Sequence, residues 1–266
     1  MRRSLIIGCL VSLLTLPAAV QAQYNYTTNG NTITINKYTG SASTLTIPNA
    51  IEGRPVTSIG SNAFQDCTSL RRVTIPDSVT SMELNTFRDC TNLMSVTIPN
   101  GVVNIGHLAF LNCKSLTSVT IPNSVTNVGA LAFQDCTSLT SITIPNSVTR
   151  IGQRIFYNCT SLTNAIIGNG VTTIEEHSFS NCSSLKSVTI GRGVTIIEPV
   201  AFYECTNLVS ILFQGNHPRG FDTSTPFYGD PATIYYLSGA TGWGKTFCGH
   251  PTALWTGKSP SGQTAP

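Results

Sequence analysis

The sequence predicts a repeat solenoid, in which similar turns stack to give a parallel strand face, short helical or 3₁₀ arcs and a cap at each end. Cysteine recurs every 23 residues from Cys67 to Cys205, and phenylalanine keeps the same step three places earlier, from Phe64 to Phe202. Leucine follows three places after each cysteine. Columns that repeat at such a period are typical of solenoids, because no single unit can bury its apolar face alone.

The turn that ends at Cys159 shows the elements of one unit. Ile142 and Ile144 alternate with polar residues, which predicts a strand with one buried side. Pro145 ends that strand, because proline cannot donate to the ladder. Phe156 and Cys159 are three residues apart, a spacing that suits one or two turns of helix or 3₁₀ helix.

The first 22 residues have the three parts of a signal peptide. Arg2 and Arg3 precede the apolar run LIIGCLVSLLTL, and small residues lead to a cleavage site between Ala22 and Gln23. The apolar run stops at Pro17, short of the roughly 20 residues that cross a bilayer. We therefore expect a secreted or cell-surface protein with no transmembrane segment after signal cleavage.

Composition limits the class of partner. Charged residues make up 10% of the 266 residues and the net charge is +3, with no basic run beyond two adjacent arginines. Nucleic-acid binders carry a basic patch or stripe, so we expect no nucleic-acid partner.

The recurring phrase LTSVTIPNSVT, followed by F-x-x-C, resembles the BspA-like leucine-rich repeats of secreted and surface proteins. This resemblance implies a right-handed superhelix and a role in adhesion. With the signal peptide at 1–22, the resemblance divides the chain into an N-terminal cap at 23–44, repeats at 45–213 and a strand-rich C-terminal cap with aromatic fill at 214–258. We expect residues 259–266 to be a disordered tail. An insertion of five residues lies between Ile47 and Ile59. Glycine replaces the repeat proline at Gly168 and Gly191, and Ala165 replaces the strand valine, so we expect the stack to loosen there.

Two polar columns could hold a metal, but their spacing favours structure. The cysteines lack the clustered pairs of a zinc site, so we expect buried thiols and no metal, although pairing among these cysteines stays open. Acidic or amide residues before each cysteine could bind calcium, but we expect them to cap turns. These residues are Asp66, Asp89, Asn112, Asp135, Asn158, Asn181 and Glu204.

Among the acidic residues, Glu175 and Glu198, with Glu176 beside Glu175, most resemble a pair of catalytic carboxylates. They share a column with several glycines on the arc, where we expect exposure to solvent rather than the burial of a glycosidase acid. No nucleophile triad or phosphate loop occurs, so we expect no catalysis and no cofactor.

The outward strand positions are then the candidate binding surface, for a protein or glycan on another surface. Two alternatives stay open: a structural envelope component without a specific ligand, and a polysaccharide-active enzyme on a solenoid. Serine and threonine also suit exposed strands when nothing binds. The candidate ligand-binding residues, on the face we expect to be concave, are Ser95, Thr97, Ser118, Thr120, Ser141 and Thr143.

Overall fold

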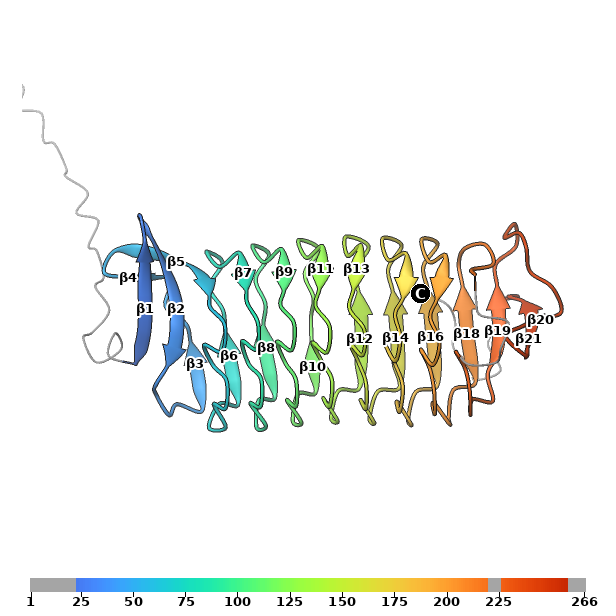
Figure 1. The fold of residues 1–266 in the computed structure, drawn as a ribbon, viewed down its shortest axis with the longest axis horizontal. Helices are drawn as coiled ribbons and strands as arrows, with labels where there is room; N and C mark the ends of the chain where they lie inside the picture. Colours follow the sequence, from blue (N-terminus) through green and yellow to red (C-terminus); the bar gives the residue numbers. More distant parts are fainter. Residues whose placement is uncertain (1–22, 220–225, 258–266) are drawn as a thin grey trace, which may run out of the picture.

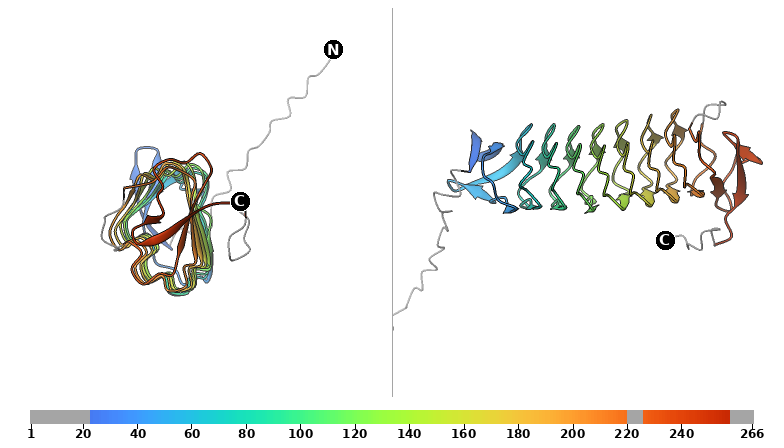
Figure 2. Two further views of the ribbon diagram at one scale, coloured as in Figure 1. Left: turned by 90° about the vertical axis from the view of Figure 1, so that its right-hand side faces the viewer. Right: turned by 90° about the horizontal axis from the view of Figure 1, so that it is seen from below.

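The computed structural model describes residues 23–219 and 226–257. They form an elongated, nearly straight stack of turns (Figure 1), which superimpose as a flattened tube in the end-on view of Figure 2. The regular elements of these residues are all β-strands. The described residues contain no helix long and apolar enough to cross a bilayer. The predicted signal peptide at 1–22 and tail at 259–266 lie outside the described residues.

One strand of each turn builds what we call the first strand face. Val73 and Ile142 point into the core from these strands, while Thr74 and Thr143 are exposed. Neighbouring strands pair in parallel with residues 23 apart in register, as the pairing of β6 with β8 shows. The strands are β3 (Thr44–Thr46), β6 (Arg72–Thr74), β8 (Ser95–Thr97), β10 (Ser118–Val119), β12 (Ser141–Ile144), β14 (Asn164–Ile167), β16 (Ser187–Ile190), β18 (Ser210–Phe213) and β19 (Thr233–Tyr236).

Another strand of most turns builds the second strand face, whose sheets are separate from those of the first face. The chain rises through the first strand, turns over after the proline and descends through the second, as the arrows of β12 and β13 show in Figure 1. The strands are β5 (Arg54–Ile59), β7 (Ser81–Met82), β9 (Asn104–Ile105), β11 (Asn127–Val128), β13 (Arg150–Ile151), β15 (Thr173–Ile174) and β17 (Ile196–Ile197).

The predicted helical arcs are wrong, because the chain forms successive turns there. In one arc, the N–H groups of Leu131, Phe133 and Asp135 donate to carbonyls of the next turn, at 2.9 to 3.0 Å. Backbone groups used between turns cannot close helical bonds within the arc. Leu131 and Asp135 also have positive φ, 58° and 59°, which interrupts a right-handed helix.

The column before the cysteines has a role in these turns. All seven residues have φ between 58° and 62°, the left-handed region that asparagine and aspartate tolerate best. Their side chains also connect turns, since the Asn112 amide donates to Asp89 at 2.6 Å and the Asn158 amide to Asp135 at 2.7 Å.

The N-terminal end is closed by hairpins. β1 (Tyr24–Asn29) pairs antiparallel with β2 (Thr32–Tyr38), and β2 pairs in parallel with β5. The five-residue insertion forms a second hairpin between β4 (Ala50–Ile51) and β5, with positive φ at Glu52 and Gly53 in its turn.

The C-terminal end continues the first strand face before it closes. β19 pairs in parallel with β18, again 23 residues apart, so one more turn follows residue 213. β21 (His250–Leu254) and β20 (Thr246–Phe247) finish this sheet. Phe213 and Phe247 are buried beside Trp243, with which they form close ring contacts.

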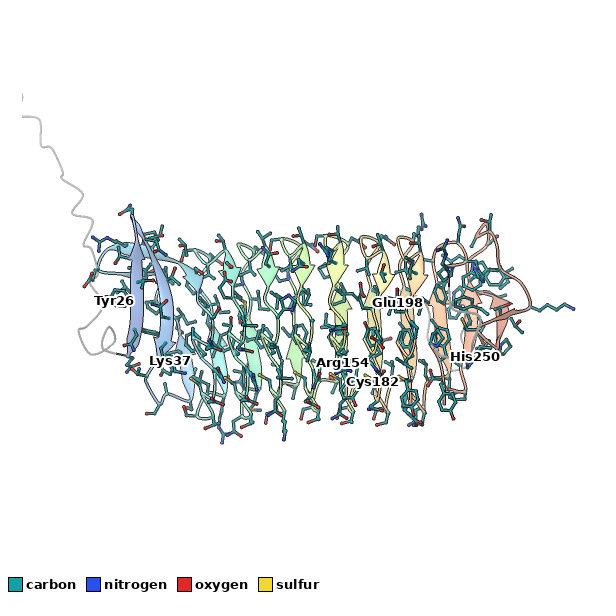
Figure 3. The ribbon with its side chains drawn as sticks, viewed as in Figure 1. Tyr26, Lys37, Arg154, Cys182, Glu198 and His250 are labelled. Atoms are coloured by element: carbon teal, nitrogen blue, oxygen red, sulfur yellow. The ribbon has the colours of Figure 1, made fainter. Side chains whose placement is uncertain are left out.

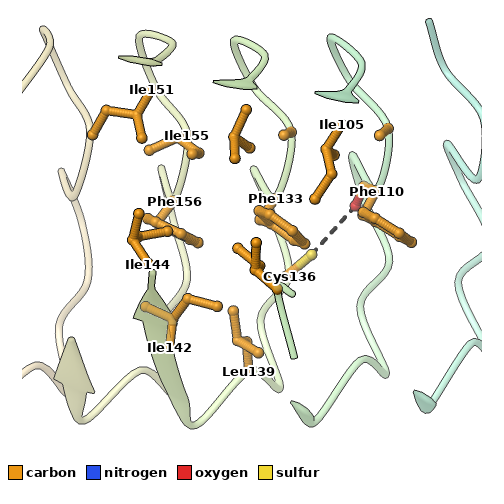
Figure 4. Packing of buried hydrophobic residues seen from close by; sticks show 14 of the residues in the cluster. Ile105, Phe110, Phe133, Cys136, Leu139, Ile142, Ile144, Ile151, Ile155 and Phe156 are labelled. Atoms are coloured by element: carbon orange, nitrogen blue, oxygen red, sulfur yellow. Dashed lines mark hydrogen bonds between the residues drawn. The ribbon is translucent and has the colours of Figure 1, made fainter. Parts of the chain in front are cut away.

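The core is an unbroken ladder of aromatic rings. Consecutive rings stack with centroids 5.0 to 5.5 Å apart from Tyr38 to Phe227, and Tyr24 adds a tilted ring at 5.4 Å. Cysteines lie next to this ladder, as Cys136 does in Figure 4, and Figure 3 labels Cys182 of the same column. They are buried from Cys90 to Cys205, whereas Cys67 at the start is half-buried.

The expected loosening near Gly168 and Gly191 is wrong for the first strand face. β14 and β16 are four residues long and pair fully with their neighbours. A Cβ at Gly168 would lie 2.5 Å from the carbonyl carbon of Pro145, and one at Gly191 would lie 2.6 Å from that of Gly168. Glycine therefore permits closer approach than the proline that it replaces, and it restores a donor, since Gly191 N–H bonds to Ile167 O at 2.8 Å.

Candidate functional site

The structure places the six predicted binding residues side by side on the first strand face. Ser95 and Thr97 belong to β8, Ser118 and Thr120 to the next turn at β10, and Ser141 and Thr143 to β12, as the labels of Figure 1 locate them. Their side chains point outward because strand residues alternate between core and solvent. Ser95 is half-exposed and the other five are exposed.

The first strand face consists of two sheets, and the division between them falls among these six residues, between β10 and β12. β10 pairs with β8, and β12 pairs with β14, but no pairing joins β10 to β12 among the described strands. A groove of about 550 Å³ lies at the division. Ser118, Thr120, Ser141 and Thr143 line it, while Ser95 and Thr97 lie one turn away.

The core is partly open at the base of this groove. Val119 occupies the inward position that is buried at Val73, Val96 and Ile142, yet it is only half-buried. The groove therefore has apolar groups at its base and hydroxyl groups along its rims. Its lining, drawn from the described residues, contains no ionisable side chain. Such a site can form hydrogen bonds and apolar contacts, but it has no charge with which to attract an ion.

Two asparagines of the groove were missed from the sequence. Asn123 and Asn146 follow the prolines that end the strands and line the groove with the four hydroxyl residues. The Asn146 side-chain oxygen already accepts the N–H of Asn169 at 2.7 Å. Both are the asparagine of the repeated TIPN phrase. Because this asparagine recurs so regularly, the sequence favoured a structural role for it over a binding role.

The surface changes toward the C-terminus. Ile166 is half-buried and Leu212 is 6% exposed at positions where earlier turns have exposed threonine. Ser210 is also buried, at 5% exposed. The hydroxyl surface therefore extends over the N-terminal and central turns, from Thr74 to Thr143.

The carboxylates considered above as catalytic candidates lie on the second strand face. Glu175 follows β15 and Glu198, which Figure 3 labels, follows β17. Glu175 is half-buried rather than fully exposed. Burial raises its pKa, the neighbouring Glu198 raises it further, and Arg150 lowers it. No group of three histidine, cysteine or acidic side chains within the described residues is arranged to hold a metal ion.

Comparison with known proteins agrees with the geometry. The family described as BspA type leucine rich repeat region matches residues 34–159 and 126–220. A leucine-rich repeat protein from T. pallidum is 29% identical over 73% of this chain and 90% of its own, with a TM-score of 0.67. A leucine-rich repeat protein from Bacteroides ovatus is 26% identical, covers 82% of this chain and 60% of its own, and also gives 0.67. The search of curated proteins found no match.

Proposed function

The chain belongs to the BspA-type leucine-rich repeat family, and we propose that it is an exported binding or adhesion module that holds a partner protein against its first strand face. The observation that carries the proposal is the groove between β10 and β12, which four of the six expected residues line. Export rests on the sequence of residues 1–22.

The dimensions of the face suit a macromolecule. Strands about 4.8 Å apart give nine strands a length of roughly 40 Å, enough for one side of a standard protein interface. The hydroxyl rows supply hydrogen-bond partners, and the half-buried Val119 supplies apolar surface at the centre. Interfaces commonly combine an apolar centre with a polar rim.

The groove lining, among the described residues, has no ionisable group, which indicates how a partner would bind. Binding there depends on shape and hydrogen bonds rather than on charge steering, so its affinity should vary little with salt. A glycan partner would use the same hydroxyl and amide groups and is an alternative outcome of the test. A structural envelope component would show no partner that depends on this face.

The test compares variants of the secreted protein in capture from envelope and host-matrix fractions. Thr120→Arg with Thr143→Arg puts two bulky cations on the groove rim and should abolish capture without lowering the melting temperature. Thr68→Arg with Thr206→Arg adds the same charge at exposed positions of the arcs and should bind normally. Equal capture by both double variants would exclude the first strand face as the binding site.

A further inference from the structure

A second groove, of about 650 Å³, lies on the second strand face. Its polar lining includes His107, Asn127, Arg150, Gln153 and Glu175. The groove shares no residue with the one between β10 and β12, and its strands belong to different sheets. It is therefore a separate concave site, with ionisable side chains that the first groove lacks.

The local backbone explains why a groove forms here. Gly129 and Gly152 leave the base without side chains, because a Cβ at Gly129 would lie 2.5 Å from His107 N and one at Gly152 would lie 2.2 Å from Ala130 N. Glu175 stands in the same column one turn later. The described strands β13 and β15 are not paired, so the ladder of this face opens between these two turns.

Five side chains bring hydrogen-bond donors and acceptors to the groove. Among the described residues, none forms an ion pair with the Arg150 guanidinium, which keeps its donors available. His107 Nδ1 accepts the Ala130 N–H at 3.2 Å, so a neutral ring carries its hydrogen on Nε2 and can donate. The Glu175 carboxylate supplies acceptors, and the Asn127 and Gln153 amides can do both.

We propose that this groove is a saccharide-binding site for an uncharged, polyhydroxylated ligand, separate from the protein-binding face. A sugar hydroxyl can accept a hydrogen bond from Arg150 and donate one to Glu175, so adjacent hydroxyls match a groove that holds both groups. Glu175, with Glu198 in the next turn, opposes an anionic ligand. Arg150 opposes a cationic ligand, and the polar lining opposes an apolar one.

The experiment uses the mature chain on an array of immobilised neutral oligosaccharides that also carries uronic-acid and amino-sugar members of similar size. The strongest neutral sugar is then titrated in solution by NMR. We expect saturable binding that Arg150→Met and Glu175→Gln each weaken at least tenfold. Arg71→Met makes the same change at an exposed residue outside the groove and should bind like wild type.

The outcomes separate this site from the first strand face. The Thr120→Arg and Thr143→Arg variant should keep its sugar affinity, because neither residue lines the second groove. Binding of no neutral sugar would overturn the proposal, as would groove variants with wild-type affinity. A preference for the uronic-acid members that grows in Glu175→Gln would also overturn it, since Arg150 would then bind an anion against Glu175.

Discussion

Cys136 donates its thiol hydrogen to the backbone carbonyl of Phe110, with 3.3 Å between Sγ and O (Figure 4). The same bond joins each buried cysteine from Cys90 to Cys205 to the phenylalanine 26 residues before it. The cysteine column therefore fills the core and adds a second hydrogen bond, from the next turn, to carbonyls that already accept a backbone N–H, as Phe110 O does from Cys113 at 3.2 Å.

The buried thiols should be unreactive in the folded protein. Burial raises the pKa of Cys136 well above its usual value, and the neighbouring Cys113 raises it further, so little thiolate forms. Cys67 is the half-buried member of the column and should react with a thiol reagent before the other six. Labelling before and after denaturation measures this order. The Cys67→Ser variant should lose one rapidly reacting equivalent, and rapid labelling of the other six column cysteines would contradict the packing.

The phenylalanine ladder should be most sensitive in its middle. Phe133 is fully buried and stacks between Phe110 at 5.2 Å and Phe156 at 5.5 Å. Phe133→Ala should lower the free energy of unfolding by about 3–5 kcal/mol, because it removes a large buried side chain and leaves a cavity. Denaturant unfolding measures the loss. Tyr228→Ala removes a ring that is 58% exposed and should cost far less; equal losses would mean that the ladder does not carry the core.

The period of the sequence predicts the solenoid because burial alone sets the phenylalanine, cysteine and leucine columns. Three features escape that reasoning. Phe227 extends the ring ladder at a spacing of 25 residues from Phe202, so it does not fall in a 23-residue register. Tyr38 joins the ladder from a hairpin rather than from a repeat. The arcs are turns because alternate N–H groups bond to the next turn, and hydrophobic spacing carries no information about that choice.

The candidate site could be predicted only in part. Alternation along each strand places Ser118, Thr120, Ser141 and Thr143 outward, and the structure agrees. The divisions in the two strand faces could not be predicted, because each depends on how closely two particular turns approach. The phrases around β10 and β12 are almost identical in sequence, yet these strands do not pair.

Close packing of the second strand face should depend on its glycines. A Cβ at Gly152 would lie 2.2 Å from the backbone nitrogen of Ala130, so Gly152→Ala must push two turns apart. We expect a loss of about 1–3 kcal/mol, typical of overpacking. Gly244→Ala is the matched control, because its closest contact would be 3.9 Å away. Thermal unfolding should separate the two variants, and equal melting temperatures would mean that the turns can separate at no cost.

Asp230 gives the C-terminal end an unusual buried carboxyl group. Both of its oxygens are buried without a hydrogen-bond partner among the described residues. Burial raises its pKa from 3.8 to about 8; the nearby Cys205 N–H lowers the pKa and Glu204 raises it. The folded protein therefore holds Asp230 as the neutral acid at neutral pH, whereas the unfolded chain ionises it.

The stability of wild type should consequently fall as the pH rises. Because the folded pKa exceeds the unfolded one, the contribution of Asp230 is complete below pH 3.8 and is lost as the pH rises to about 8. The Asp230→Asn variant cannot ionise at this position, so its free energy of unfolding should not show this fall. At alkaline pH the variant should therefore exceed wild type in free energy of unfolding by more than about 1 kcal/mol. Urea unfolding of both proteins across this range isolates the effect, because the two proteins differ at no other residue. A constant difference at every pH would show that Asp230 ionises normally in the folded protein.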